Sequence, residues 1–315
     1  MKCVGILGSG FGIYGYLPAL IQIGVNKVFL PIRYQTAFFS RHELKIFENY
    51  VCWSKDERQM LSIVDSVVVA LPPSFQSAYV KILIKLPNIK NIILEKPLDI
   101  NPELSWDLLE KLKISNKKFC IGYNFRYSSW CPAVFGKSKI NSFVQTERNL
   151  EINWDFLAPH YKNNSLIWKR YHSLGGGILR FYGIHLIALL SEYGYSDVVT
   201  SNLIGPVSDD YTKWNAIFSG NGLPLCEVNL NSRSDKKEFH ILETINTRKK
   251  ILVKQQDPFE VREFDIKYGI QDRRVPYLID CCQSLINEDK LSSNWYKDAI
   301  ILWGRVEKTS NFCED

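Results

Sequence analysis

Residues 4–12 read Val-Gly-Ile-Leu-Gly-Ser-Gly-Phe-Gly, an apolar run that leads directly into closely spaced glycines. The run predicts a strand, and the stretch after it is helix-like, so the glycines fall on the turn between the two. Glycines there permit a tight turn and let backbone N–H groups approach a pyrophosphate at a helix N-terminus. The pattern is imperfect, because Ile13 stands where the usual motif has its last small residue. We expect a dinucleotide to contact Gly8, Ser9, Gly10, Phe11, Gly12 and Ile13, with a glycine turn that binds no ligand as the alternative.

Short apolar runs alternate with amphipathic stretches through the first third of the chain. The runs are CVGIL, KVFL, DSVVVAL, NIILE and FCIGY, between Lys2 and about Gly122. This alternation predicts βαβ units and a parallel sheet, and continuous apolar runs are typical of strands covered by helices on both faces. Residues 1–122 are therefore predicted to form a doubly wound α/β domain of the Rossmann type.

The pattern changes after Tyr123 to longer segments in which apolar and polar residues alternate. These segments are SFVQTERNLEINW, TKWNAIFSG, LCEVNLNS, EFHILETIN and KKILVKQ. Such alternation favours an antiparallel sheet with one exposed face. Residues 123–315 are predicted to form an α+β domain with a large, mostly antiparallel open sheet, and helices are expected over 176–193, 275–287 and 294–309.

Composition narrows the class of protein. The 315 residues include 39 basic and 33 acidic side chains spread along the chain, and no apolar run approaches the ~18 residues of a membrane helix. We therefore expect neither a nucleic-acid partner nor a membrane. The eight cysteines form no CxxC pair and no metal-ligand spacing with the histidines, which predicts reduced thiols and no metal. The N-terminus lacks the pattern of a signal peptide, so a cytoplasmic protein is expected.

The end of the second predicted strand bears on the choice of cofactor. A site for NAD usually carries an acidic residue there, which accepts a hydrogen bond from the ribose. This chain reads Phe29-Leu30-Pro31-Ile32-Arg33 instead. Because a guanidinium favours a 2′-phosphate, Arg33 predicts NADP as the cofactor, with NAD as the alternative.

Further motifs follow the glycine turn in order. They are Leu71-Pro72-Pro73, Leu94-Glu95-Lys96-Pro97-Leu98, Gly122-Tyr123-Asn124-Phe125-Arg126-Tyr127, and Gly175-Gly176-Gly177 with His185 downstream. Over residues 3–195 the chain resembles the glucose-fructose oxidoreductase, inositol dehydrogenase and MocA superfamily. The resemblance implies hydride transfer between NAD(P) and a sugar, polyol or imine, and an open sheet that forms homodimers or homotetramers.

The resemblance also implies roles for individual residues. Lys96 matches the lysine that hydrogen-bonds the reacting oxygen, and His185 matches the family's acid/base, a task that suits either group if its pKa lies near neutral. The other cofactor contacts implied are Leu71, Pro72, Gln76, Glu95, Lys96 and Asn124. The substrate contacts expected are Arg126, Tyr127, Trp154, Trp168, Tyr171 and Tyr182.

Three polar positions of the family are changed. Phe181 and Ala188 stand where relatives often have aspartates, and Gln76 stands where they have a histidine. The first interpretation is an oxidoreductase acting on the C=O or CH–OH group of a sugar, sugar nucleotide or polyhydroxy compound. A reductase of C=N bonds is an alternative. Because the aspartate is lost at Phe181, a catalytically silent dinucleotide-binding regulatory or partner protein is another alternative. His185 as a buried structural histidine is a further alternative. Gly183 in the same helix as His185 is expected to allow the close approach of another group, such as a nicotinamide or a substrate.

Overall fold

The computed structural model describes residues 1–136, 148–259, 272–286 and 293–315. Two compact units emerge from their packing. The first contains residues 1–99 and 107–127 together with helix α11 (Val275–Ile286). The second contains residues 100–106, the described part of 128–259, and the C-terminal helix α12 (Ser293–Thr309) and strand β13 (Ser310–Glu314). Within these described ranges, no helix has the length and apolar character needed to span a membrane.

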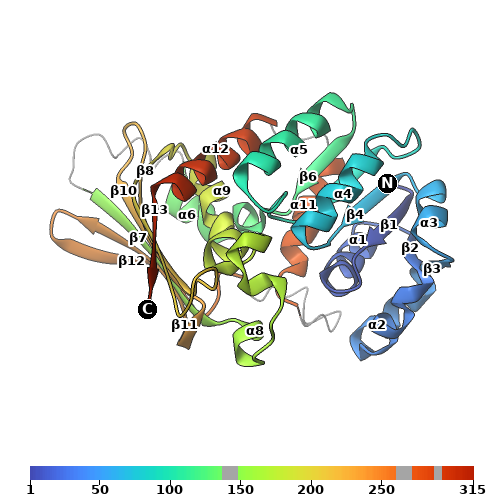
Figure 1. Cartoon of the computed structure of the whole chain (residues 1–315), viewed down its shortest axis with the longest axis horizontal. Coiled ribbons are helices and arrows are strands. Elements are labelled where there is room, and N and C mark those ends of the chain that lie inside the picture. Colours follow the sequence, from blue (N-terminus) through green and yellow to red (C-terminus); the bar gives the residue numbers. More distant parts are fainter. Residues whose placement is uncertain (137–147, 260–271, 287–292) are drawn as a thin grey trace. The chain divides into compact units, whose positions relative to one another are not determined.

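A six-stranded parallel sheet forms the centre of the first unit (Figure 1). Its order is β3-β2-β1-β4-β5-β6, with β1 in the middle. The strands are β1 (Cys3–Leu7), β2 (Lys27–Pro31), β3 (Val51–Ser54), β4 (Ser66–Val69), β5 (Asn91–Leu94) and β6 (Lys118–Ile121). Every residue of β4 is buried, as a strand covered on both faces should be. The predicted doubly wound sheet is confirmed, with the edge strand β3 as an addition that the sequence did not predict.

Helices connect these strands. They are α1 (Leu17–Gln22), α2 (Gln35–Phe39), α3 (Glu57–Ile63), α4 (Pro73–Leu83) and α5 (Pro102–Ile114), with shorter turns η1 (Gly12–Tyr16), η2 (Ile32–Tyr34), η3 (His42–Tyr50) and η4 (Asn124–Tyr127). Helix α11 comes from far along the chain, yet it packs against α1 and β6. Its buried cysteines, Cys281 and Cys282, belong to the same core as Cys120 of β6. The first unit is therefore completed by helix α11, which comes from the last fifth of the chain.

A seven-stranded mixed sheet forms the second unit, in the order β12-β11-β7-β10-β9-β8-β13. Its strands are β7 (Arg148–Leu157), β8 (Asp197–Gly205), β9 (Lys213–Ser219), β10 (Leu225–Asn231), β11 (Arg233–Ile245), β12 (Arg248–Gln255) and β13 (Ser310–Glu314). Most neighbours are antiparallel, whereas β7–β10 and β8–β13 are parallel. The predicted large, mostly antiparallel sheet is thus confirmed. The predicted strand segment 142–147 lies outside the described residues.

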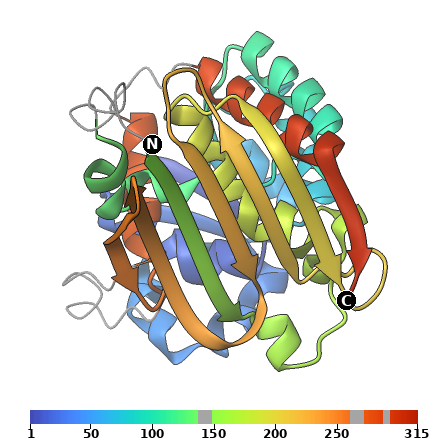
Figure 2. The same cartoon turned by 90° about the vertical axis from the view of Figure 1, so that its left-hand side faces the viewer.

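One face of this sheet is open and the other is covered (Figure 2). Helices α9 (Ile184–Glu192) and α12 (Ser293–Thr309) pack together, and α12 also contacts β8. Burial alternates along β9, so that Trp214, Ala216 and Phe218 point to the covered face and the residues between them to the open one. The remaining helical segments are α6 (Trp130–Phe135), α8 (Pro159–Lys162), η6 (Trp168–Arg170), η7 (His172–Leu174) and η8 (Ile178–Gly183).

A row of amide side chains crosses the open face. The strand registers align five asparagines with one another: Asn311, Asn202, Asn215, Asn229 and Asn153. Neighbours in this asparagine row are hydrogen-bonded at 3.3 Å for the first pair, 2.6 Å for the third and 3.2 Å for the fourth. Part of the hydrogen-bonding capacity of the side chains on the open face is therefore used within the row itself.

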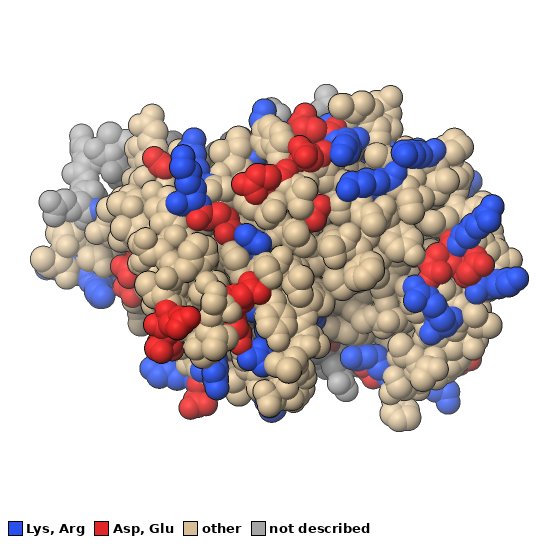
Figure 3. Space-filling model, in the orientation of Figure 1, with Lys and Arg blue, Asp and Glu red and all other residues tan. Residues whose placement is uncertain are grey.

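Charges are mixed over the surface that Figure 3 displays. Lysine and arginine side chains lie beside aspartate and glutamate rather than forming one continuous patch. On that face, charged side chains of both signs therefore lie in small groups.

Candidate functional site

The glycine turn lies at the carboxyl end of β1, at the edge where open α/β sheets bind their ligands. Gly8 has φ of +127°, and a Cβ there would lie 2.2 Å from the carbonyl oxygen of Ala70, so only glycine fits. Gly10 is exposed, and no atom lies within 4 Å of the position its Cβ would take. The helical turn η1 then begins at Gly12 and is π-helical, a form frequent at functional sites. This open, glycine-lined turn fits a pyrophosphate.

The larger side chains of the turn face inward. Ile13 is fully buried, so only its backbone is available to a ligand. Phe11 packs edge-on against the rings of Tyr14 and Tyr16, each with a centroid distance of 5.5 Å. The guanidinium of Arg274 lies 4.0 Å from the Phe11 ring centroid. The side chains of Phe11 and Ile13 therefore hold the turn in place.

Arg33 lies in η2 directly after β2, as the sequence predicted. Its guanidinium forms an ion pair with Glu57, the first residue of α3, and 62% of its side chain is exposed. The neighbouring Tyr34 hydroxyl accepts a hydrogen bond from the Gly8 N–H at 3.1 Å, and Arg33 Nη2 donates to the same hydroxyl at 3.4 Å. Tyr34 thus joins Arg33 to the glycine turn.

The Glu95-Lys96-Pro97 segment follows β5 at the same edge of the sheet. Lys96 is 8% exposed, and its peptide bond to Pro97 is cis. Gln76 of α4 is fully buried and holds this segment: its Nε2 donates to the carbonyl oxygens of Glu95 at 2.7 Å and Pro97 at 3.1 Å. Its Oε1 accepts from the Glu95 N–H at 3.0 Å. Gln76 therefore fixes the backbone around Lys96, and its contact with a cofactor stays a prediction.

The carboxyl group of Glu95 is placed by Tyr16 of η1. The Tyr16 hydroxyl is fully buried and donates to Glu95 Oε1 at 2.6 Å. Burial raises the pKa of the Glu95 carboxyl, while the Lys96 ammonium and the Tyr16 hydroxyl act in the opposite direction. Burial and the Glu95 charge together raise the pKa of Tyr16 well above its usual value. The glycine-turn helix and the lysine segment are thus linked by one short hydrogen bond.

The remaining residues predicted for the first unit lie at the carboxyl ends of β4 and β6. Leu71 and Pro72 are partly exposed in the turn before α4. Asn124 is buried in η4, and its Oδ1 has no hydrogen-bond partner among the described residues. A buried amide oxygen of this kind is available to a ligand donor. Arg126 lies 5.5 Å from the ring of Tyr127, whose hydroxyl is 3.1 Å from Ser284 Oγ of α11.

The second unit gathers three of the six predicted substrate residues, Trp154, Trp168 and Tyr182, into one aromatic cluster around Phe181. Tyr182 lies edge-on to Trp154 of β7 at 5.8 Å and to Phe181 at 4.8 Å. Phe181 in turn packs edge-on against Trp168 at 5.4 Å, and Lys169 Nζ lies 5.1 Å from its ring centroid. Trp154 is 5% exposed and Tyr182 more so. The apolar ring of Phe181 therefore lies at the centre of this cluster, between Trp168 and Tyr182.

His185 lies in the first turn of α9, 6% exposed, with its ring edge-on to Phe259 at 6.3 Å. Gly183, two residues earlier, meets a different neighbour from the one expected. A Cβ at Gly183 would lie 2.7 Å from Cζ3 of Trp214, an indole of β9. The expected close approach at Gly183 is therefore present, but the approaching group is the protein's own Trp214 and not a nicotinamide or a substrate.

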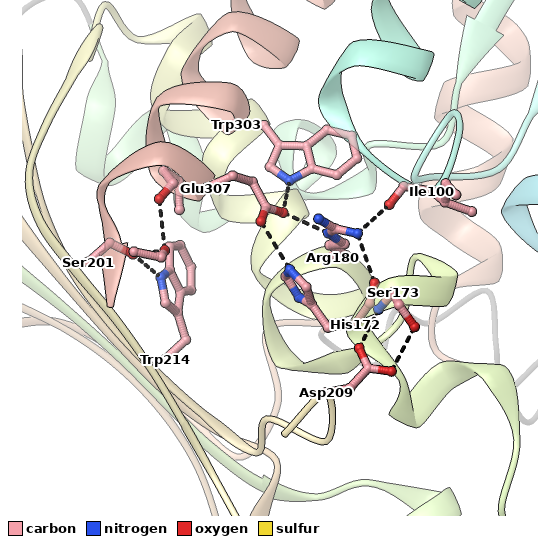
Figure 4. Close-up of polar contacts among 11 residues, drawn as sticks. Ile100, His172, Ser173, Arg180, Ser201, Asp209, Trp214, Trp303 and Glu307 are labelled. Atoms are coloured by element: carbon pink, nitrogen blue, oxygen red, sulfur yellow. Dashed lines mark hydrogen bonds and ion pairs between the residues drawn. The ribbon is translucent and has the colours of Figure 1, made fainter. Parts of the chain in front are cut away.

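A network of ion pairs holds the segment that leads to His185 (Figure 4). Arg180 Nε donates to Glu307 Oε1 of α12 at 2.7 Å, and Arg180 Nη1 donates to the carbonyl oxygens of Ile100 and His172, both at 2.9 Å. His172 Nε2 lies 3.0 Å from Glu307 Oε2, and Trp303 donates to the same carboxylate at 2.8 Å. Burial alone would raise the pKa of Glu307, but His172 and Arg180 outweigh it and hold the pKa at about 2. Tyr171 lies beside this network, before η7.

Sequence reasoning missed three residues of this site: Tyr16, Tyr34 and Glu57. Tyr16 and Tyr34 stand next to predicted segments, and a polar ring in an otherwise apolar stretch was the available signal. Glu57 is 24 residues from Arg33 and gave no signal, because the edge strand β3 that brings it to Arg33 was not predicted.

The chain matches no protein-family model and no curated protein. Its fold is similar to that of several solved structures. The WlbA dehydrogenase from Bordetella pertussis, in complex with NADH and UDP-GlcNAcA, is 13% identical with a TM-score of 0.76, over 98% of this chain and 95% of that one. The 3-ketoreductase KijD10 from Actinomadura kijaniata, with NADP and TDP-benzene, is 12% identical with a TM-score of 0.70, over 100% and 99%. A myo-inositol dehydrogenase from Corynebacterium glutamicum is 16% identical with a TM-score of 0.68, over 98% and 96%.

Proposed function

We propose that this chain is an NADP(H)-dependent oxidoreductase of the glucose-fructose oxidoreductase, inositol dehydrogenase and MocA superfamily. Its substrate would be a C=O or CH–OH group of a sugar, sugar nucleotide or related polyhydroxy compound. The observation that carries the proposal is Lys96, nearly buried at the carboxyl edge of the parallel sheet and held there by Gln76. The sugar-nucleotide and inositol names of the structural neighbours support the substrate class.

The dinucleotide would be held by the turn from Gly8 to Ile13 at its pyrophosphate, with Arg33 toward the 2′-phosphate of NADP. Leu71, Pro72 and Asn124 would border its other end. A bound nicotinamide supplies or accepts the hydride. The open backbone at Gly10 and the unsatisfied Oδ1 of Asn124 support such a ligand.

Lys96 and His185 would handle the oxygen of the reacting carbon. An ammonium beside a carbonyl oxygen stabilises the negative charge that develops there during reduction. A nearly buried histidine is suited to hold the proton that the oxygen gains or loses. Arg126, Tyr127, Trp154, Trp168, Tyr171 and Tyr182 would line the substrate, and the aromatic cluster around Tyr182 supports a sugar ring.

Turnover of candidate sugars and sugar nucleotides, with NADPH or NADP, tests the proposal. Lys96→Ala and His185→Ala are each expected to lower kcat by at least about 100-fold, the usual effect of losing a positioned proton donor. Lys90→Ala is the matched control, because this exposed lysine precedes the same strand at its opposite end. His240→Ala on the open face of the sheet is the control for His185. Full turnover by both active-site variants would refute the mechanism.

A silent dinucleotide-binding regulator is the second candidate. Phe181 favours it, because its ring, packed between Trp168 and Tyr182, leaves no carboxylate at the position of the family aspartate. A complex with NADPH and a sugar nucleotide separates the two. A substrate carbon in hydride reach with Lys96 on its oxygen supports the enzyme, whether the bond is C=O or C=N, and a blocked pocket supports the regulator.

A further inference from the structure

The ion pair between Arg33 and Glu57 brings two opposed cofactor determinants together. In doubly wound sheets, the residue after the second strand contacts the adenosine ribose of the cofactor. A carboxylate there accepts a hydrogen bond from the 2′-hydroxyl of NAD, whereas an arginine binds the 2′-phosphate of NADP. Arg33 follows β2, and Glu57 follows the neighbouring strand β3 at the start of α3. The guanidinium contacts the Glu57 carboxylate through both Nε and Nη2. This chain therefore presents both determinants at one point.

This pair is connected to the glycine turn. Arg33 Nη2 lies 3.4 Å from the Tyr34 hydroxyl, and that hydroxyl accepts from the Gly8 N–H at 3.1 Å. The Arg33 guanidinium also lies over the Tyr34 ring, 5.0 Å from its centroid. Tyr79 of α4 is close enough for Glu57 to raise its pKa and for Arg33 to lower it, in addition to the larger effect of burial. The pair thus lies among residues that border the carboxyl edge of β1, β2 and β4.

We infer that Glu57 sets the choice between NAD and NADP, by accepting from the ribose hydroxyls of NAD and by competing with the 2′-phosphate of NADP for Arg33. The inference rests on the proposed function and names the specificity determinant of its cofactor site. To bind NADP, Arg33 must exchange a carboxylate for a phosphate, and Glu57 is then left beside a second anion. To bind NAD, the pair stays intact, and the free lone pairs of Glu57 accept the hydroxyl.

Affinity for the two cofactors tests this. Dissociation constants of NADH and NADPH are measured by fluorescence titration for the full chain, and their ratio, NADPH over NADH, is compared between variants. Glu57→Gln removes the competing charge and weakens the acceptor, so the ratio is expected to fall about tenfold or more. Arg33→Gln should raise the ratio by a similar factor. Asp56, which caps α3 by accepting from the Gln59 N–H at 2.8 Å, is unchanged in both variants, so the helix is retained.

The chain offers a control in Glu110 of α5, an acidic side chain of the same unit that pairs with Lys113 at 3.3 Å. Glu110→Gln removes the same charge in the last turns of α5, away from Arg33 and its hydrogen bonds to Tyr34, and the ratio should stay at its wild-type value. A Glu57→Gln variant that binds both dinucleotides in the wild-type ratio overturns the inference and leaves the proposed function intact. A wild-type chain that binds neither dinucleotide overturns both.

Discussion

Tyr16 illustrates how one hydroxyl stabilises the ionised form of a carboxyl group away from water. Its O–H donates to Glu95 Oε1 at 2.6 Å, and the ammonium of Lys96 also lowers the pKa of the Glu95 carboxyl. A hydrogen bond to a charged group is worth about 1.5–3 kcal/mol, more than a neutral one. The pair therefore contributes to the stability of the segment that carries Lys96.

Tyr16→Phe should destabilise the protein by about 1–3 kcal/mol near neutral pH, because the Glu95 carboxylate loses a donor. The folded pKa of Glu95 is already above its ordinary value, so the native state binds the extra proton and stability falls as pH rises through that range. Without the Tyr16 hydroxyl the pKa rises further, and the deficit against wild type should be larger at pH 8 than at pH 4. Urea unfolding at both values measures it, with Tyr50→Phe at an exposed tyrosine as the control. A deficit that is the same at both values would contradict the assigned cause.

At the residue scale, the sequence predicted single positions better than pairs. Lys96 and Arg33 lie after their strands as expected, because strand ends can be recognised from the chain itself. The partner of Arg33 could not be predicted, because pairing between Glu57 and Arg33 depends on which strands are neighbours. Gly183 shows the same limit: its glycine indicated a close approach, but the approaching group, Trp214, is 31 residues away.

At the scale of elements, the two helical turns η1 and η8 are alike. Both are π-helical, both follow closely spaced glycines, and each leads into a helix of the site. Strands β8 and β13 were not predicted, because polar residues that face the open side of the sheet interrupt their apolar pattern. Such segments form strands because one of their faces is buried in the folded protein, and the sequence alone does not show which face that is.

Gly183→Ala should destabilise the second unit by about 1–3 kcal/mol, because the new methyl group overlaps the Trp214 ring. Gly304→Ala in α12 is the matched control: its Cβ would lie 3.6 Å from Pro102, an ordinary contact, so helix propensity should stabilise by about 0.5–1 kcal/mol. Denaturant unfolding of the two variants compares them directly. Equal changes in the free energy of unfolding would show that the Trp214 ring moves aside without a loss of stability.

For the whole molecule, the open sheet face is the surface on which the proposed homodimer or homotetramer would form. Asn229 lies on β10, the central strand of the sheet, and its side chain is bonded to Asn215, Asn153 and Glu227. Asn229→Lys should reduce the assembly to monomers, because the longer side chain projects into a packed interface and its charge loses hydration there, which the adjacent Glu227 offsets only in part. Sedimentation velocity gives the measurement, and Lys90→Glu at an exposed position of the first unit is the control. An unchanged sedimentation coefficient would place the interface elsewhere.

The asparagine row also bears on how the seven strands find their alignment during folding. Side chains of a strand alternate between faces, so a slip of one residue would turn its asparagine from the open face into the core. A slip of two residues would keep the face and break the amide contacts to both neighbours. The parallel pairing of β7 with β10 has no tight hairpin to set its alignment, and there the contact between Asn153 and Asn229 discriminates between registers. The hydrogen bonds of the asparagine row therefore favour the native register of the strands over registers shifted by one or two residues.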